Sequence, residues 1–426
     1  MNKFIGPEKI IKKKKNFLFP CSNHFYKNPP QIVRGEMQYL FDSTGKKYID
    51  FFAGVSVMNC GHCNSEILNA AIKQMQKLQH TTTIYLTEPI VNLAEKLSIL
   101  LPGNIKHSFF CCSGSEANEG ALLLARLYTG KNNFISLKNS LHGRTYLTMS
   151  TTGIPMWRTD PNLDNSITFV QNAYNKDKPL DVSAAESLNE IEKTIKHIGS
   201  KNIAALIAEP IQGNGGIITP PSWYFKDLKK LLEKHNILLI IDEVQTGFGR
   251  TGKMFAIEHY DVVPDIITIA KALGNGFPIG AFCTNDAIAA SFTKPSASTL
   301  GGNPVSAEAA ISVLNYIENN NLCERAALLG EKLKNELIKL KEKHLIIKNV
   351  RGLGLMLGAE LVKTDGTPAT EETDLILELL KDKGILIGKN GIDRNVLAFQ
   401  PPLVINEDNI NNLINKLDIV LTNLKL

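Results

Sequence analysis

Short, almost entirely apolar runs alternate with amphipathic stretches through the middle of the chain. Three of these runs, at residues 203–208, 237–241 and 266–269, are rich in β-branched residues and are followed by polar or glycine-containing sequence. Such runs are typical of strands that are buried on both faces of a parallel sheet. The helical pattern of residues 223–235 lies between the first two runs, so we expect a βαβ unit there.

Both ends of the chain carry a different pattern. Residues 35–50 hold two apolar runs around Ser-Thr-Gly, which predicts a hairpin. After Gly302 we expect helices at 307–317, 323–343, 371–383 and 407–424, and strands at 346–350, 355–361, 384–387 and 396–399. The sequence thus predicts an α/β protein with a large domain of mostly parallel sheet (61–306) and a smaller α+β domain (307–426) that the N-terminal segment (1–60) joins.

Composition narrows the class of protein without identifying it. The 426 residues are 43% hydrophobic and 21% charged, which is typical of a folded globular protein. A net charge of +5 is too weak to indicate nucleic acid binding, and we expect the basic run Lys12–Lys15 to be a solvated face. No run approaches 18 apolar residues and no secretory signal is evident, so no membrane association is expected.

The number and spacing of the cysteines indicate the redox state of the compartment in which the protein occurs. Seven of them at irregular spacing favour a reducing environment over a disulfide framework, so we expect a cytoplasmic protein. The segment Cys60-Gly-His-Cys63 has no second ligand pair after it, so no metal site is expected.

A turn of small residues that opens a helix is the first candidate for binding chemistry. The segment Cys112-Ser-Gly-Ser-Glu-Ala-Asn-Glu119 precedes helical sequence as far as Arg126. Free N–H groups at a helix N-terminus attract an anion, and Gly114 lets the backbone approach it closely. The same residues also suit an ordinary helix cap.

Two further segments place charged groups after predicted strands. Asp242 and Glu243 follow the run at 237–241, at the edge where open α/β sheets bind ligands. Lys271 follows the run at 266–269, and in an apolar setting the pKa of such an amine falls, so that it becomes a Schiff-base nucleophile. Taken singly, the acid could cap a loop and the lysine could lie on the surface.

Together the three segments match the needs of one cofactor. Pyridoxal phosphate (PLP) requires an anchor for its phosphate, a carboxylate for its pyridinium nitrogen and a lysine tether. The 29-residue separation of Asp242 and Lys271 allows one further α/β crossover, so we expect both groups at the same sheet edge.

The chain resembles the class III aminotransferases of the ornithine/4-aminobutyrate type, in the branch that is like alanine–glyoxylate aminotransferase 2. These are fold type I PLP enzymes. The similarity runs from about Tyr39 to the end, and residues 208–276 carry its most specific block. The resemblance implies that Asp242 pairs with the pyridine nitrogen and that Lys271 is the catalytic lysine. For cofactor binding it further implies Ser113, Gly114, Ser115, Leu141, His142, Glu209, Val244 and Gln245, together with Thr299, which would serve the neighbouring subunit of a homodimer with shared active sites.

Several positions depart from the family pattern. The residue before His142 is usually aromatic but here is Leu141, which would cover the ring by apolar contact without ring stacking. Arg144 matches the arginine that binds the distal carboxylate of the substrate in 4-aminobutyrate-type relatives, although it could also form a structural ion pair. A glutamate and an arginine that form a gate in such relatives are replaced by Asn214 and Ala398, so both charges are missing together. Arg394 could compensate only if the local backbone turned it inward.

These residues predict a ping-pong aminotransferase. We expect an ω-amino donor with a distal acidic group (β-alanine, 4-aminobutyrate, 5-aminovalerate or taurine) and a 2-oxo acid acceptor (pyruvate, glyoxylate or 2-oxoglutarate). The alternative is a PLP-dependent amino-acid racemase or epimerase of the same family, which would not need the gate. A binding protein without enzymatic activity is less consistent with the presence of both Asp242 and Lys271, because binding alone needs no electron sink.

Overall fold

A seven-stranded sheet forms the centre of the computed structural model, which describes residues 4–424. Only β10 runs against its neighbours, since it pairs antiparallel with both β9 and β4, and the remaining pairs are parallel. In spatial order the strands are β4 (His107–Cys111), β10 (Gly280–Thr284), β9 (Ile266–Ile269), β8 (Leu238–Asp242), β7 (Ile203–Ala208), β5 (Asn133–Leu137) and β6 (Ile167–Val170).

Helices bury both faces of this sheet, as the all-apolar strands predict. On one face Ala205 and Ile207 of β7 share a core cluster with Ala121 and Leu122 of α5 (Gly114–Thr129). On the other face Leu206 of β7 shares a second cluster with residues of α8 (Tyr224–Lys234) and α7 (Leu180–Ile198). The expected βαβ unit of β7, α8 and β8 is therefore present, with β7 and β8 parallel.

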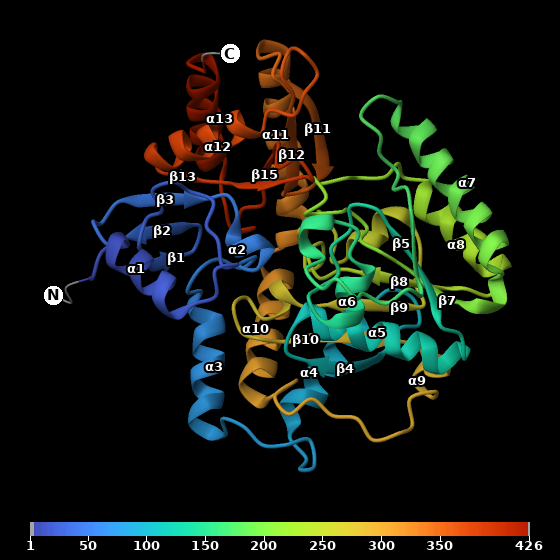
Figure 1. The fold of residues 1–426 in the computed structure, drawn as a ribbon. Helices are drawn as coiled ribbons and strands as arrows, with labels where there is room; N and C mark the ends of the chain where they lie inside the picture. Colours follow the sequence, from blue (N-terminus) through green and yellow to red (C-terminus); the bar gives the residue numbers. More distant parts are fainter. Residues whose placement is uncertain (1–3, 425–426) are drawn as a thin grey trace.

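The C-terminal part builds an antiparallel sheet that lies above the central sheet in Figure 1. Its strands, in spatial order, are β11 (Ile347–Leu353), β12 (Met356–Leu361), β15 (Val396–Phe399) and β14 (Gly388–Asn390). The long helices α10 (Pro304–Asn319) and α11 (Leu322–Lys343) connect the central sheet to this one. Two more helices complete the C-terminal part, α12 (Thr370–Asp382) and α13 (Glu407–Thr422).

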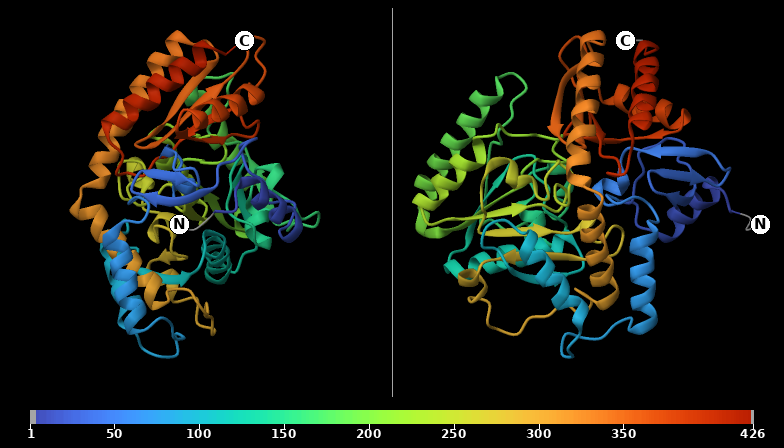
Figure 2. Two further views of the ribbon diagram at one scale, coloured as in Figure 1. Left: turned by 90° about the vertical axis from the view of Figure 1, so that its left-hand side faces the viewer. Right: turned by 180° about the vertical axis from the view of Figure 1, so that it is seen from behind.

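Strands from both ends of the chain share a third sheet. It contains β1 (Ile32–Glu36), β2 (Tyr39–Asp42), β3 (Lys47–Asp50) and β13 (Ile385–Leu386), and β13 pairs parallel with β3. Figures 1 and 2 show the N-terminal sheet beside the C-terminal elements. The division of the chain at residues 60 and 306 stays a prediction. The other helices are α1 (Pro7–Phe17), α2 (Ala53–Ser56), α3 (Ser65–Lys77), α4 (Glu88–Leu100), α6 (Tyr146–Thr151) and α9 (Asp286–Ala289).

Two connections differ from those that the sequence predicts. The strand expected at 384–387 is present as β13, but directly after it the chain enters a different sheet at β14 (Gly388–Asn390), which was not predicted. The crossover between β8 and β9 contains no α-helix but only loops and a 3-10 turn at Ala256–Tyr260. Parallel pairing of β8 with β9 nevertheless brings their carboxyl ends to one edge. No helix within residues 4–424 is long and apolar enough to cross a membrane.

Candidate active site

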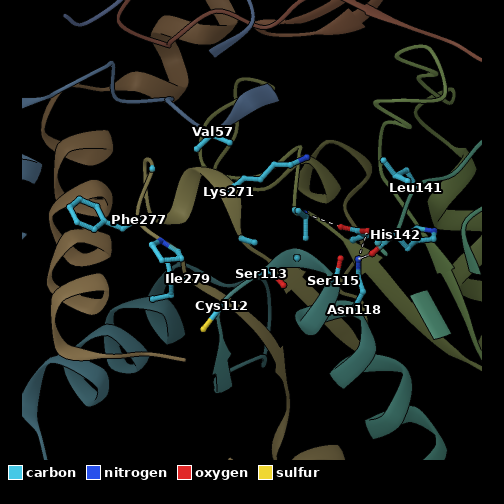
Figure 3. Close-up of a pocket in the computed structure, with 17 residues that line it drawn as sticks. Val57, Cys112, Ser113, Ser115, Asn118, Leu141, His142, Lys271, Phe277 and Ile279 are labelled. Carbon is cyan, nitrogen blue, oxygen red and sulfur yellow. Dashed lines mark hydrogen bonds and ion pairs between the residues drawn. The ribbon is translucent and has the colours of Figure 1, made fainter. Parts of the chain in front are cut away.

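A cavity of about 350 Å³ lies at the carboxyl ends of the central strands. It is lined by residues of all three motifs that the sequence singles out, namely residues 112–115, Asp242 and Val244, and residues 270–271. Figure 3 shows Lys271 reaching across the cavity above Ser113 and Ser115, with Leu141 and His142 on one side. The crevice at the strand ends is where α/β sheets of this kind bind ligands.

The turn before α5 has the form of an anion cradle. Ser113 caps the helix by accepting a hydrogen bond from Glu116 N at 3.2 Å, and the first N–H groups of α5 lack partners within the helix. A Cβ at position 114 would come within 2.7 Å of Val244 Cγ1, so any residue other than glycine would require the Val244 side chain to shift. Ser115 Oγ accepts a hydrogen bond from Arg144 N at 3.1 Å. The helix dipole and free N–H groups suit a phosphate.

The carboxylate of Asp242 is buried and almost fully hydrogen-bonded. Its Oδ2 accepts from Asn118 Nδ2 at 2.7 Å and lies 2.8 Å from His142 Nδ1, and its Oδ1 accepts from Val244 N at 3.0 Å. A carboxylate offers about four acceptor positions. Three are used here, which leaves one for the N–H of a protonated ring in the cavity.

Asn118 is a site residue that our sequence analysis missed. Thr268 Oγ1 donates to its Oδ1 at 2.6 Å, which orients the amide so that Nδ2 faces Asp242 and the carbonyl of His142. The available signal was its spacing, since Asn118 lies four residues after Gly114 and therefore one helical turn into α5.

Lys271 stands at a strained position beside this carboxylate. It follows β9 by two residues and adopts φ 45°, an uncommon value for a residue other than glycine. Burial lowers the pKa of its amine, whereas the charges of Asp242 and Glu209 act in the opposite direction. A lowered pKa increases the fraction of neutral, nucleophilic amine at neutral pH.

Glu209 and Gln245 lie behind the cavity wall and do not line the cavity. The carboxylate of Glu209 accepts from Leu141 N and from Gly213 N, both at 2.9 Å, and so holds two loops together. Burial raises the pKa of Glu209 to about 7. Gln245 is buried and its Nε2 has no hydrogen-bond partner among the described residues. Gly213 makes room for it, because a Cβ there would lie 2.0 Å from Gln245 Oε1.

Other predicted residues lie outside the cavity. Arg144 and Thr299 are exposed, and Arg144 forms no ion pair within residues 4–424. Glu243, although adjacent to Asp242, instead contacts Thr246 Oγ1 and accepts from Ile257 N in the core.

The two gate positions carry no charge into the site. Asn214 is partly buried, and Ala398 is buried on β15. Arg394 is 46% exposed at its side chain and lies 3.8 Å from Asp374 Oδ2, so it does not replace the missing arginine here. No cluster of three or more His, Cys, Asp or Glu side chains suited to a metal occurs in the described part of the chain.

The residues present fit PLP, because a phosphate cradle, a carboxylate with one free acceptor position and a lysine surround one cavity. Comparison with known proteins decides the family, because the family model Aminotransferase class-III matches residues 22–421. The chain belongs to this family. It is a PLP-dependent enzyme of the class III aminotransferases, with their fold type I architecture.

Relatives within the family differ in activity. Alanine–glyoxylate aminotransferase 2 homolog 2 of Arabidopsis thaliana is 43% identical over 423 residues, covering 97% of this chain and 88% of the relative. A leucine/methionine racemase of Thermococcus litoralis is 37% identical, covering 94% and 92%. Acetylornithine aminotransferases are 36–40% identical. Among solved structures, an (S)-enantioselective omega-transaminase from Thermomicrobium roseum is 32% identical, with a TM-score of 0.90 over 97% of this chain and 98% of that one.

Replacement of Asn118 tests the hydrogen bonds that support Asp242. Asn118→Ala removes one of three donors to a buried carboxylate, which costs about 1–3 kcal/mol. We expect PLP to dissociate about tenfold or more readily, as measured by equilibrium dialysis. Asn172→Ala, which removes an amide bonded to Lys138 O away from the cavity, is the control and should leave PLP affinity unchanged. Equal affinity in Asn118→Ala and the wild type would contradict the role of Asn118.

The burial of Glu243 should make the free energy of unfolding depend on pH. Burial raises its pKa from 4.5 to about 7, so the folded protein holds a proton there that the unfolded chain releases at lower pH. The free energy of unfolding should therefore fall as pH rises from about 4.5 to 7, by up to about 3 kcal/mol. Urea unfolding at several pH values should show a shallower fall for Glu243→Gln, whereas the exposed control Glu342→Gln keeps the wild-type slope. Identical slopes in both variants would refute this assignment.

Proposed function

We propose that the protein transfers the amino group of an ω-amino acid to a 2-oxo acid by a ping-pong mechanism. The donor is of the β-alanine, 4-aminobutyrate, 5-aminovalerate or taurine type, and the acceptor is pyruvate, glyoxylate or 2-oxoglutarate. This proposal rests on where arginine side chains lie relative to the cavity. No arginine lines the cavity, and Arg144 follows the cavity residue Gly143 with a guanidinium that is exposed and unpaired within the described residues.

Arg144 can select a donor whose acidic group is distant from its amine. Its backbone is fixed, because Arg144 N donates to Ser115 Oγ at the rim of the cradle. A guanidinium binds a planar carboxylate through two parallel hydrogen bonds and also accepts a sulfonate. The positions that would bind the carboxylate beside a reacting amine in 4-aminobutyrate-type relatives are occupied by neutral Asn214 and Ala398.

The residues around the cavity have distinct proposed roles. When bound, PLP supplies an electron sink that stabilises negative charge on the carbon beside the reacting nitrogen. Asp242 holds a proton on the ring nitrogen, and Gly114, Ser115 and the N-terminus of α5 bind the phosphate. Lys271 Nζ removes the proton from the amine-bearing carbon of the donor. Leu141 and Val244, which both line the cavity, would pack against the bound cofactor and exclude water from it.

Assembly into a homodimer with shared active sites is part of the proposal. Thr299 lies outside the cavity of its own chain, where it could reach a neighbouring subunit. The loop between α3 and α4 supports self-association, because Ile84, Tyr85 and Leu86 are 83%, 66% and 102% exposed. The cytoplasm remains the compartment that the sequence predicts.

A racemase is the second candidate, and the leucine/methionine racemase of Thermococcus litoralis favours it. Racemisation needs only one substrate carboxylate and no 2-oxo acid half-reaction. The loss of both gate charges is compatible with it, since no buried charge is left without a partner.

Two amino donors, one with and one without a carboxylate, test the role of Arg144. Purified holoenzyme with pyruvate should convert 4-aminobutyrate faster than n-butylamine, with alanine measured by chromatography. Arg144→Ala should lower kcat/KM for 4-aminobutyrate by about 10- to 100-fold, as expected for loss of a charged hydrogen bond, and change butylamine turnover by less than about twofold. An equal loss with both donors would contradict the assignment of Arg144.

The two reactions are separated by a second measurement. Leucine incubated with holoenzyme in deuterated water without a 2-oxo acid should keep its optical activity if the protein is an aminotransferase of ω-amines. Loss of optical activity with deuterium at the α-carbon and no keto product would favour the racemase and overturn our proposal.

A further inference from the structure

A second cavity, of about 440 Å³, lies between the central sheet and the C-terminal sheet. On one side it is bounded by the loop 174–180 that joins β6 to α7, and on the other by α11 and β11. None of its lining residues lines the cavity that contains Lys271. It is therefore a separate feature of the fold.

The lining of this cavity is strongly basic. Six cations line it and no acidic residue does, the cations being Lys176, Lys178, Lys334, Lys341, Lys348 and Arg351. Lys178 pairs with Glu186 at 2.7 Å and Arg351 with Glu360 at 2.5 Å. The other four form no ion pair with a carboxylate within residues 4–424. This concentration of unpaired charge contrasts with the net charge of +5 for the whole chain.

Arg351 is held firmly in the lining of the cavity. Its guanidinium lies 4.5 Å from the centre of the Tyr174 ring, and its Nε donates to Gly216 O at 2.8 Å. Tyr174 Oη donates to Glu360 Oε2 at 2.6 Å, the same oxygen that Arg351 contacts. A side chain fixed by stacking, an ion pair and a backbone contact loses little freedom when it binds a ligand.

Helix α7 adds to the positive potential. Leu180, the first residue of this 19-residue helix, lines the cavity, so the helix N-terminus faces the same space as the lysines. The N-terminus of a helix carries about half a positive charge and free N–H groups. Positive charges around a concave site add to one positive potential, which raises the local concentration of anions.

We propose that this cavity binds a small molecule that carries a chain of phosphates, such as a nucleoside triphosphate or inorganic tripolyphosphate. Its volume suits a ligand of that size rather than a macromolecule. Several closely spaced negative charges are needed to engage lysines that come from both sides of the cavity. A bound polyphosphate bridges the loop 174–180 to α11 and β11, and neutralises cations that otherwise repel one another.

The test uses the PLP-saturated holoenzyme, so that the phosphate cradle beside Lys271 is filled. Binding of inorganic tripolyphosphate is measured by titration calorimetry at low salt. Lys341→Gln/Lys348→Gln should weaken binding about tenfold or more, because two charges in direct reach of the ligand are lost. The matched control Lys13→Gln/Lys15→Gln removes two exposed charges from α1 and should change affinity by less than about twofold.

The calorimetric results can either overturn or support the proposed polyphosphate site. Absence of binding to the wild type at millimolar tripolyphosphate, or equal weakening in the two double variants, would overturn it. Selective weakening at Lys341 and Lys348 supports it. A parallel titration with a nucleoside triphosphate identifies the source: tighter binding than that of tripolyphosphate indicates a nucleotide ligand, and equal binding indicates that the phosphate chain alone is recognised.

Discussion

An ionised carboxylate at the end of a completely apolar strand is costly unless donors surround it. Asp242 ends β8, whose five residues are all buried, and its position is sustained by Asn118, His142 and the N–H of Val244. These donors come from α5, from the loop after β5 and from the turn after β8. The relative positions of these three elements, and so the shape of the cavity, therefore depend on the hydrogen bonds to one carboxylate.

Further buried contacts connect the loops around this carboxylate. Glu209 connects the loop of Leu141 to Gly213, and Gly213 leaves space for Gln245. The adjacent Asn214 carries no charge where 4-aminobutyrate-type relatives have a gating glutamate. The buried contacts of Glu209 and Gln245 thus involve residues that the family resemblance implies for cofactor binding, whereas the neutral Asn214 departs from the pattern of those relatives. Cofactor chemistry can be retained in this way while specificity changes.

Three of the seven strands of the central sheet (β7, β8 and β9) and the helix α8 could be predicted, because their apolar patterns reflect burial on two faces and on one face, respectively. The sheet edge that brings Asp242 and Lys271 together followed from the same pattern. Asn118 was missed, since its spacing from Gly114 is only a weak signal until Thr268 and Asp242 are seen on either side of it. Pattern alone also missed β14, which directly follows the strand expected at 384–387 but belongs to a different sheet from β13. Arg394 illustrates a further limit, because its side-chain direction depends on a local backbone with φ 55°.

The proposed mechanism requires that Lys271 is the lysine that tethers PLP in the cavity beside Asp242. Borohydride reduction of the holoenzyme followed by peptide mass mapping tests it most directly. If Lys271 is the tether, the mass of the reduced cofactor is found on the peptide that contains Lys271, and no peptide carries it in Lys271→Ala. Labelling of a different lysine in the wild type, or no labelling at all, would contradict this assignment.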